Sequence, residues 1–533
     1  MAVVRYRTTA AGDCGIQNGV NYTFTPFRST YSPGAVNMRF HSSFSALLCT
    51  AVVVACNDKP APSDALNAPT DVRQAQAVSG SPTVNSIVNV TNDTTAQNET
   101  PLAVNPLNAQ NLVTGNNDWN YNDGCGVNAS FNGGKTWTKT LPNGFLPGVT
   151  RFTNDPDVPG TGDGDFGGDP AAAFGPDGTA YFACFSYYGL RTTLLLSRST
   201  DGGATWQGGA HAIPSDPLTL VSAFNGNGIA KGSNGQFPDH EAMSVGADGA
   251  IYVTWAQFHG YGSNSPVWIS TSTDGGRSFS RPVKVSSGNI RSDQDQRIVT
   301  NTEGSVAYVT FDNAIQGGKG TAMFVSKSTD HGRTWSTPFQ FAVFTNPVCL
   351  FPPYCFNISG GQFRGPGSYP APAYNPVDNR LYVAYADIDA DGKAKIFLTS
   401  AAAGDLTQWT PRTVVASVPS GDRFAAELGI APNGRIDIAF YDRSYTANTM
   451  VDLTYATSSD FGATWRSVRV SRSSFDPSVW GVPSGSGIRP FIGDYNGIVS
   501  LATSAGMTWT GAGTKNYGAL PTNLEIYFAS VTP

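Results

Sequence analysis

Short apolar runs recur along the chain at even spacing, and turns rich in Gly, Asp and Asn separate them. The clearest runs end in Ser and cover 194–199, 267–272, 323–328, 395–400 and 453–458. A hairpin precedes each run; in 171–182, for example, the turn Pro176-Asp177-Gly178 separates two apolar halves. Short, evenly spaced strands joined by tight turns are typical of β-propeller blades. The pattern therefore predicts an all-β protein built from antiparallel sheets.

An eight-residue motif, Ser-x-Asp-x-Gly-x-x-aromatic, follows four of these runs. Its complete copies begin at Ser199, Ser272, Ser328 and Ser458. A copy beginning at Ser130 has Asn132 in place of Asp, and a degenerate copy spans 400–409. We expect the Asp carboxylate to accept hydrogen bonds from backbone N–H groups of its own turn, and the Gly to supply a positive φ. These residues are therefore predicted to be architectural rather than catalytic.

The motif resembles the Asp-box of the sialidase-like (BNR-repeat) propellers, and the resemblance extends from about residue 83 to the C-terminus. Seven units of a hairpin plus a third strand begin near Glu99, Asp169, Asp239, Asp295, Tyr369, Arg423 and Asp494. The seventh unit lacks a fourth strand, whereas residues 84–90, ahead of the first unit, have strand character. We expect this segment to complete the last blade and hide the sheet edges. The prediction is a seven-bladed β-propeller of four-stranded antiparallel blades over 83–533; the alternative is the six-bladed ring usual among sialidases.

The composition narrows the choice of partners. Charged residues make up 14% of the chain, against about 25% in an average globular protein. The net charge is −6, so no nucleic-acid partner is expected, because phosphate binding needs a basic face. No apolar run reaches the ~20 residues of a membrane-spanning helix. What remains is a large, turn-rich β protein, which we expect to be a monomer.

The front of the chain carries the features of a bacterial export signal. Residues 38–56 combine a short basic head, an apolar stretch and a terminal Cys56. The end of this stretch, Val53-Val54-Ala55-Cys56, resembles the lipobox, in which the cysteine is acylated. We therefore expect an exported protein, lipid-anchored in the cell envelope or extracellular, with 1–37 as an extension from a misassigned start and 57–82 as a flexible linker. The alternative is a buried strand that happens to end in Cys.

The other cysteines fit an oxidising compartment. Cys14 and Cys49 lie in the leader together with Cys56, which leaves four of the seven cysteines. An even number favours disulfides. Cys349 and Cys355 lie close enough in sequence to close one loop, and Cys125 and Cys184 would then join neighbouring repeats. No Cys or His spacing suggests zinc.

Strand order places the candidate chemistry on one face. The eight-residue motif turns from the third to the fourth strand of a blade, so it shares a face with the first hairpin turn. The innermost strands start on the opposite face, and the resemblance implies that the active site lies there. Charged residues recur at these starts and at the ends of the second strands. For any one of them, an ion pair that ties two blades together is the alternative.

The resemblance implies sialidase chemistry, which uses arginines to hold the substrate carboxylate, a Tyr–Glu nucleophile pair and an Asp acid/base. Candidate catalytic residues are Asp239, Glu241, Asp295, Glu427 and Tyr495. Candidate substrate-binding residues are His240, Arg297, Arg423, Asp442, Arg443, Arg489 and Asp494. The Phe/Tyr-Arg-Ile-Pro motif of sialidases is absent, so a hydrolase with two carboxyl groups acting on another glycan is equally compatible. The expected function is a glycan-acting glycoside hydrolase; the alternative is a non-catalytic propeller that binds a glycan or a protein.

One acidic turn has the spacing of a calcium loop. Asp387, Asp389 and Asp391 alternate ahead of Gly392, as the first ligands of such a loop do. Leu398 stands at the twelfth position, where an EF-hand has a bidentate Glu. Structural calcium is therefore a candidate here, with a solvated acidic turn as the alternative. No other cofactor is expected.

Overall fold

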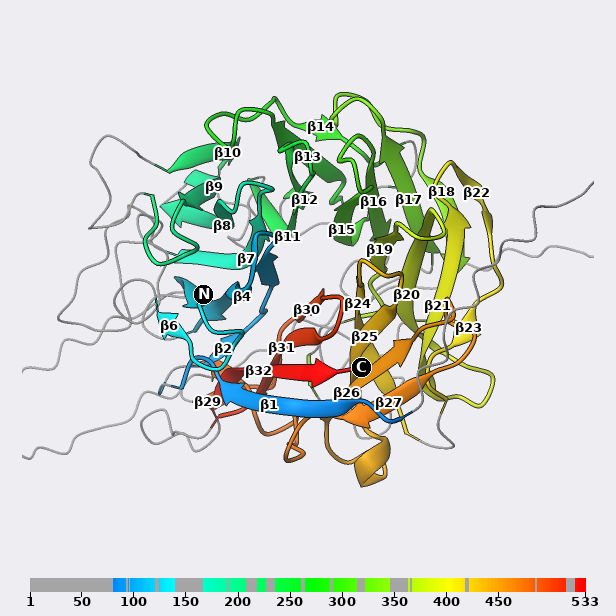
Figure 1. The fold of residues 1–533 in the computed structure, drawn as a ribbon. Coiled ribbons are helices and arrows are strands. Elements are labelled where there is room, and N and C mark those ends of the chain that lie inside the picture. The colour runs from blue at the N-terminus through cyan, green and yellow to red at the C-terminus, as the bar shows by residue number, and fades with distance from the viewer. Residues whose placement is uncertain are drawn as a thin grey trace, which may run out of the picture. The chain divides into compact units, whose positions relative to one another are not determined.

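Seven antiparallel sheets surround one axis in the computed structural model (Figure 1). The structure describes residues 80–533 apart from 93, 95, 120–123, 140–165, 189–190, 208–217, 227–234, 260–263, 288–289, 291, 314–321, 346–362, 365–366, 418–420, 485–486 and 514–522. The seven-bladed prediction is confirmed, and the innermost strands begin within about three residues of the expected unit starts. The predicted signal, the Cys56 anchor and most of the linker lie outside the described residues and remain predictions.

In each of the first four blades, the strands follow one another along the chain from the innermost strand outward. Blade 1 contains β2 (Gln97–Asn98) with β3 (Leu102–Asn105), β4 (Asn108–Asp118), β5 (Gly124–Ser130) and β6 (Thr138–Lys139). Blade 2 contains β7 (Phe166–Phe174), β8 (Ala180–Tyr188), β9 (Arg191–Ser199) and β10 (Thr219–Phe224). Blade 3 contains β11 (Gln236–Val245), β12 (Ile251–His259), β13 (Val267–Ser272) and β14 (Val283–Lys284). Blade 4 contains β15 (Gln294–Thr300), β16 (Ala307–Asp312), β17 (Ala322–Ser328) and β18 (Phe339–Val343).

The last three blades follow the same order. Blade 5 contains β19 (Ala371–Asn375), β20 (Arg380–Ile388), β21 (Ala394–Ala402) and β22 (Asp405–Trp409), and β23 (Thr413–Val414) also pairs with β21. Blade 6 contains β24 (Arg423–Ile430), β25 (Ile436–Asp442), β26 (Asp452–Ser458) and β27 (Arg466–Arg469). Blade 7 contains β30 (Gly497–Ser500), β31 (Ala505–Ala512), β32 (Leu524–Thr532) and β1 (Thr83–Asn89). A separate hairpin joins β28 (Val482–Ser484) to β29 (Gly487–Arg489).

The first described strand closes the ring. β1 pairs antiparallel with β32, from Thr83 opposite Thr532 to Asn89 opposite Tyr527. It thereby supplies the fourth strand that the seventh unit lacks, as the strand character of 84–90 predicts. The two ends of the propeller are thus held in one sheet, which covers the edge of β32. In Figure 1 this pairing lies at the lower edge, where blue β1 runs beside red β32.

The eight-residue motifs form the turns between third and fourth strands, and their hydrogen bonds are the expected ones. In the copy at Ser199, the Asp201 carboxylate accepts the backbone N–H of Thr205 at 2.9 Å, and Ser199 Oγ accepts that of Gly203 at 2.7 Å. Gly203 has a φ of 94°. Hydrogen bonds from Thr334 lower the pKa of the equivalent Asp330 to about 2. The motif carboxylates are therefore occupied within their own turns.

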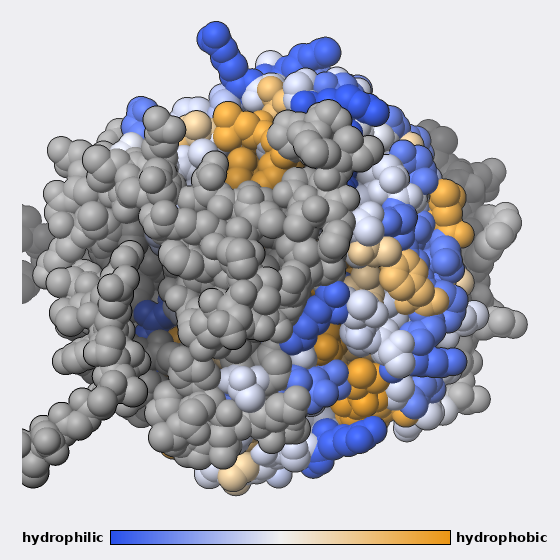
Figure 2. All heavy atoms as spheres, turned by 90° about the vertical axis from the view of Figure 1, so that its left-hand side faces the viewer, coloured by the Kyte–Doolittle hydropathy of each residue, from blue (hydrophilic) through white to orange (hydrophobic). Residues whose placement is uncertain are grey.

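Apolar side chains between neighbouring blades make up the core. Trp206, the last residue of one motif, packs with Val113 and Phe182 of blades 1 and 2. On the side shown in Figure 2, exposed apolar side chains lie as separate patches between hydrophilic ones. Among the described residues the helical content is a short 3-10 turn, Ser444–Thr446. No helix in this part of the chain is long and apolar enough to span a bilayer.

Candidate active site

Bulges in four of the seven innermost strands bring one residue each to equivalent positions near the axis. Asp169, His240, Asp295 and Ala425 sit in bulges of β7, β11, β15 and β24, with φ values between 54° and 59°. Glu99, between β2 and β3, has the same conformation with a φ of 59°. A positive φ is uncommon outside Gly and is strained backbone, and such residues cluster at functional sites. Bulges also re-aim side chains, so this recurrence marks the axis as the candidate site.

Carboxyl groups from four blades gather around one arginine. Arg364 Nη2 pairs with Asp494 Oδ2 at 2.5 Å, and its guanidinium lies 3.9 Å from the centre of the Phe491 ring. The negative charges of Asp494, Glu99, Asp239 and Asp169 all raise the pKa of Arg364. Four acids therefore face this one guanidinium. We call Glu99, Asp169, Asp239 and Asp494, together with Arg364, the acidic cluster.

The acids of this cluster are linked to one another through neighbouring blades. The amide of Asn117 donates to Glu99 Oε2, and its Oδ1 accepts the backbone N–H of Asp169 at 2.8 Å. Asp169 Oδ2 in turn accepts the backbone N–H of His240 at 2.7 Å. Gln294 donates to the carboxylate of Asp239. Blades 1 to 4 are thus joined at the axis by polar contacts.

Burial and mutual repulsion shift the acids of the cluster towards their protonated forms. Burial first, and then the charges of Asp169 and Asp494, raise the pKa of Glu99 well above 4.5. Burial and the same two charges raise the pKa of Asp239 well above 3.8. Burial also raises the pKa of Asp494, although Arg364 opposes that shift. Glu99, Asp239 and Asp494 consequently keep their protons to higher pH than isolated carboxyls do.

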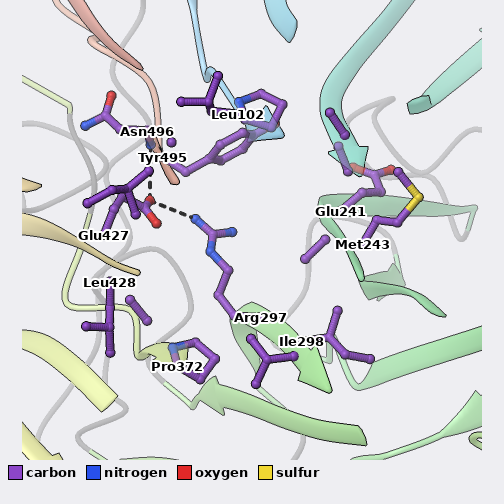
Figure 3. Close-up of a pocket in the computed structure, with 18 of the residues that line it drawn as sticks. Leu102, Glu241, Met243, Arg297, Ile298, Pro372, Glu427, Leu428, Tyr495 and Asn496 are labelled. Atoms are coloured by element: carbon purple, nitrogen blue, oxygen red, sulfur yellow. Dashed lines mark hydrogen bonds and ion pairs between the residues drawn. The ribbon is translucent and has the colours of Figure 1, made fainter. Parts of the chain in front are cut away.

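A second group of polar residues lies next to the acidic cluster along the axis. Arg297 Nη2 pairs with Glu427 Oε1 at 3.3 Å (Figure 3). Arg297 Nη1 lies 2.7 Å from His240 Nε2. Tyr369 Oη also donates to Glu427 Oε1 at 2.8 Å. The guanidinium is 4.8 Å from the centre of the Tyr369 ring and 5.2 Å from that of Tyr495. Arg297 is therefore held by charge, by hydrogen bonding and by two aromatic faces.

A cavity of about 180 Å³ lies beside this group. Glu241, Arg297, Glu427 and Tyr495 line it together with at least one apolar side chain from each blade, as Figure 3 shows for most of these residues. These apolar side chains include Leu102, Ala172, Met243, Ile298, Pro372, Leu428 and Ile498. Each comes three residues after Glu99, Asp169, His240, Asp295, Tyr369, Ala425 or Tyr495, and so lies further along its chain segment towards the face of the eight-residue motifs. The cavity therefore lies on the motif side of the charged residues, whereas the sequence analysis expects a site at the opposite face.

Most of the sequence-predicted site residues meet at the axis. His240 Nδ1 and Asp295 Oδ1 are 2.9 Å apart, and the imidazole lies 5.0 Å from the Tyr495 ring, centre to centre. The structure therefore brings together Asp239, His240, Asp295, Arg297, Glu427, Asp494 and Tyr495.

Four predicted substrate-binding residues, Arg423, Asp442, Arg443 and Arg489, lie away from the axis. Arg423 pairs with Asp442 at 3.0 Å inside blade 6. Arg443 donates to the carbonyl of Asn448 within its own turn, and Arg489 lies 5.1 Å from the Trp119 ring. The physical reason is the bulge of β24: Ala425, two residues after Arg423, occupies the axial position, so Arg423 turns into its blade.

Four further residues lie at the axis although they are not among the predicted site residues: Glu99, Asp169, Arg364 and Tyr369. Glu99 and Asp169 begin units one and two, so aligning the unit starts with His240 and Asp295 would have found both. Tyr369 begins unit five and was visible in the same way. Arg364 follows a long connection after β18 that has no strand pattern, and no sequence signal marked it.

Glu241 is buried beside the axis without a partner. Its side chain belongs to a residue that is 2% exposed, and neither carboxyl oxygen has a hydrogen-bond partner among the other described residues. Burial first, and then the charge of Asp169, raise its pKa well above 4.5. A buried polar group without a hydrogen bond costs stability.

We therefore expect Glu241→Met to stabilise the protein by about 1–3 kcal/mol, because it removes an unpaired polar group. The folded protein should also lose stability as the pH rises through the raised pKa of Glu241, since the unfolded chain ionises more easily. Denaturant unfolding over a pH series upwards from 4.5, the ordinary pKa of Glu, measures both effects, and the variant should lack the loss at higher pH. Glu427→Met is the matched control: it breaks the pair with Arg297 and should destabilise. Destabilisation by both changes would contradict the prediction.

The predicted calcium turn is occupied by cationic side chains. Lys395 Nζ lies 2.7 Å from Asp389 and 2.8 Å from Asp391, while Arg412 pairs with Asp387. No group of three or more acidic, His or Cys residues in the described part of the chain is arranged to hold a metal ion. The structural calcium therefore remains a prediction.

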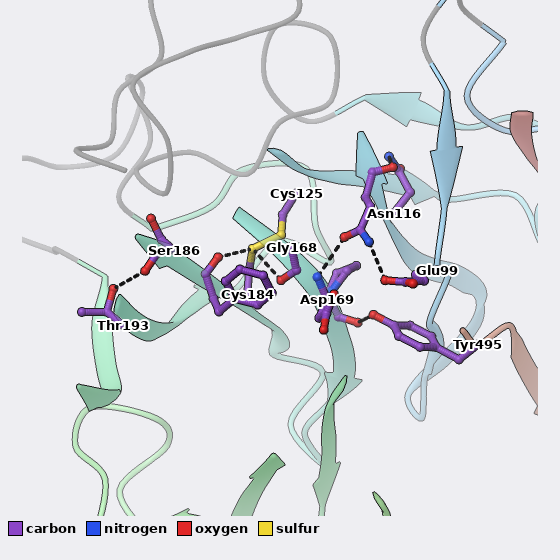
Figure 4. Close-up of a disulfide and its surroundings, with 12 residues drawn as sticks. Glu99, Asn116, Cys125, Gly168, Asp169, Cys184, Ser186, Thr193 and Tyr495 are labelled. Carbon is purple, nitrogen blue, oxygen red and sulfur yellow. Dashed lines mark hydrogen bonds between the residues drawn. A yellow bond between two sulfur atoms is a disulfide. The ribbon is translucent and has the colours of Figure 1, made fainter. Parts of the chain in front are cut away.

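A disulfide crosses the seam between blades 1 and 2, directly behind the acidic cluster (Figure 4). It joins Cys125 of β5 to Cys184 of β8, the pairing that the sequence analysis suggests. Asn117, which contacts both Glu99 and Asp169, lies opposite Cys125 in the pairing of β4 with β5. The disulfide therefore supports the strands that carry these acids. Cys349 and Cys355 lie outside the described residues, so their pairing remains a prediction.

The fold and the site define a seven-bladed propeller with an acid-rich axis. No protein-family model matches the chain. The chain is similar to a xyloglucanase from Paenibacillus sp., 26% identical over 286 residues that cover 50% of this chain and 23% of that protein. Its fold is also similar to an ulvan lyase (TM-score 0.44, 11% identity, 83% of this chain and 95% of that one). Another similar structure is an α-L-arabinanase from Penicillium chrysogenum (TM-score 0.38, 14% identity, 72% and 97%).

Proposed function

We propose that this protein is a glycan-acting hydrolase whose acid and base are carboxyl groups at the propeller axis. The observation that carries the proposal is the excess of acids around Arg364 in the acidic cluster. One guanidinium cannot balance four carboxylates, and the raised pKa values of Glu99, Asp239 and Asp494 favour their protonated forms. Glycoside hydrolysis needs such a protonated carboxyl beside an ionised one.

Within the cluster, Asp239 is the candidate general acid and Asp169 the candidate nucleophile or base. Both residues are partly exposed, whereas Glu99 is 2% and Asp494 8% exposed. A substrate could therefore reach the first pair more easily. The raised pKa of Asp239 suits proton donation to a leaving group, and the contact with the His240 N–H orients Asp169.

A neutral polysaccharide is the substrate class that we propose first. The similarity to a xyloglucanase favours xyloglucan as the first candidate. Sialidase specificity would need several arginines for the substrate carboxylate. Arg297 and Arg364, the arginines at the axis among the described residues, are already paired with Glu427 and Asp494. Export through the signal at 38–56, with an anchor at Cys56, would bring the enzyme to an extracellular glycan.

Incubating the purified protein with xyloglucan, a mixed-linkage glucan and sialyllactose tests the proposal. We expect reducing ends to be released from a polysaccharide and no release of sialic acid. Release of sialic acid alone would replace the proposal with the sialidase assignment. Binding of a glycan in calorimetry without any turnover would overturn the enzyme proposal in favour of a binding module.

A further inference from the structure

His240 links four blades through one chain of contacts. Its Nδ1 lies 2.9 Å from Asp295 Oδ1 and its Nε2 lies 2.7 Å from Arg297 Nη1. Arg297 continues to Glu427, which also accepts the hydroxyl of Tyr369. His240 comes from blade 3, Asp295 and Arg297 from blade 4, and Glu427 from blade 6, while Tyr369 immediately precedes blade 5. The imidazole thus connects Asp295 to Arg297 and, through Arg297, to Glu427 and Tyr369.

The donor properties of Arg297 fix the protonation of the imidazole in this arrangement. A guanidinium has only donors, so His240 Nε2 can interact favourably with Arg297 only as an acceptor without a proton. The proton of the neutral ring is then on Nδ1, which lies 2.9 Å from Asp295 Oδ1 but outside hydrogen-bond geometry. His240 is 2% exposed, so water cannot readily replace either contact.

We propose that His240 is a positioning residue that acts as an acid-sensitive latch of the axis. Its neutral form holds Arg297 in place against Glu427. Protonation at Nε2 would remove the acceptor and set an imidazolium against a guanidinium, so Arg297 would have to move away. An effect of this movement of Arg297 on catalysis rests on the proposed function, whereas the latch itself is a property of the folded chain.

Charged groups around the imidazole differ in how they affect a positive charge on the ring. The charged or titratable groups that face it are Asp169, Asp295, Arg297, Tyr369, Asp494 and Tyr495. The carboxylates attract a positive charge on the ring, and the guanidinium of Arg297 repels it. The latch therefore opens when the ring takes up a proton at Nε2 in spite of the repulsion by Arg297.

NMR spectroscopy of the protein labelled with 15N-histidine tests the charge state without any substrate. His240→Gln identifies the signals of His240 by their loss. At neutral pH we expect an unprotonated Nε2 and a protonated Nδ1, and on acidification a protonated Nε2. A doubly protonated ring at neutral pH, or the tautomer with the proton on Nε2, would overturn the proposal.

Thermal unfolding separates the latch from a merely structural role. His240→Gln keeps an acceptor for Arg297 and a donor for Asp295 but cannot gain a proton. Between about pH 7.5 and pH 5, the wild type and the control His331→Gln should therefore lose roughly 2 °C more in Tm than His240→Gln. An equal loss in all three proteins would overturn the latch. Because both measurements use the protein alone, an absence of turnover on glycans would contradict only the proposed function.

Discussion

Asp239→Asn should lower kcat for polysaccharide hydrolysis by about 10²–10⁴-fold, the usual contribution of a general acid. The amide keeps the size of the side chain and can still contact Gln294, but it has no proton of suitable acidity for the leaving group. The loss should appear in kcat more than in KM, because a general acid acts mainly in the transition state. Initial rates on the substrate found in the panel provide the measurement.

The leaving group provides a sharper form of this test. An aryl glycoside with an acidic phenol needs little protonation, so Asp239→Asn should retain most of its activity on that substrate. Asp169→Asn should lose activity on both kinds of substrate, since it removes the proposed nucleophile or base. Asp330→Asn, in a motif turn far along the chain, is the control and should keep wild-type rates. Equal losses on both substrates for Asp239→Asn would contradict its role as the acid.

The pH dependence of activity should also depend on Asp239. Activity that needs a protonated Asp239 falls as the pH rises through its raised pKa. On the polysaccharide, whose leaving group needs a proton, the wild type should therefore show this alkaline limb and Asp239→Asn should lack it. A limb that survives the substitution would assign the proton to another member of the acidic cluster, with Glu99 the next candidate.

The propeller could be predicted because its signals are local. The turn at Ser199 is determined by hydrogen bonds within seven residues, and each motif follows a strand that ends at a fixed place in its blade. The closure by β1 followed from counting strands. These features depend on neighbouring residues in the sequence, so the order of strands and the number of blades could be inferred before the structure was known.

The site could be predicted only in part, because bulges decide which residues face the axis. A regular strand alternates its side chains, but a bulge adds one residue and changes that alternation. Ala425 thus takes the axial position in blade 6, and Arg423 does not. In blade 3, His240 takes that position and Glu241 is left without a partner. Arg364 reaches the axis from a connection, so no repeat pattern could indicate it.

Removing the disulfide with Cys125→Ala and Cys184→Ala together should lower the free energy of unfolding by about 4 kcal/mol, because a cross-link with a sequence separation of 59 residues restricts the unfolded chain. The effect should extend to catalysis. Cys184 Sγ lies 3.4 Å from the carbonyl of Gly168, which directly precedes Asp169, and Asn117 lies opposite Cys125.

Denaturant unfolding of the double variant, and of the wild type with and without a reductant, measures the loss of stability. Reduced wild type and the double variant should share one midpoint, below that of the oxidised protein. The double variant Cys349→Ala with Cys355→Ala, treated in the same way, shows how much of the reductant's effect on stability comes from these two cysteines. If the acids of blades 1 and 2 depend on this seam, kcat should fall in the double variant under conditions where circular dichroism still shows a folded β protein. An unchanged midpoint would show that packing between Val113, Phe182 and Trp206 holds the seam without the disulfide.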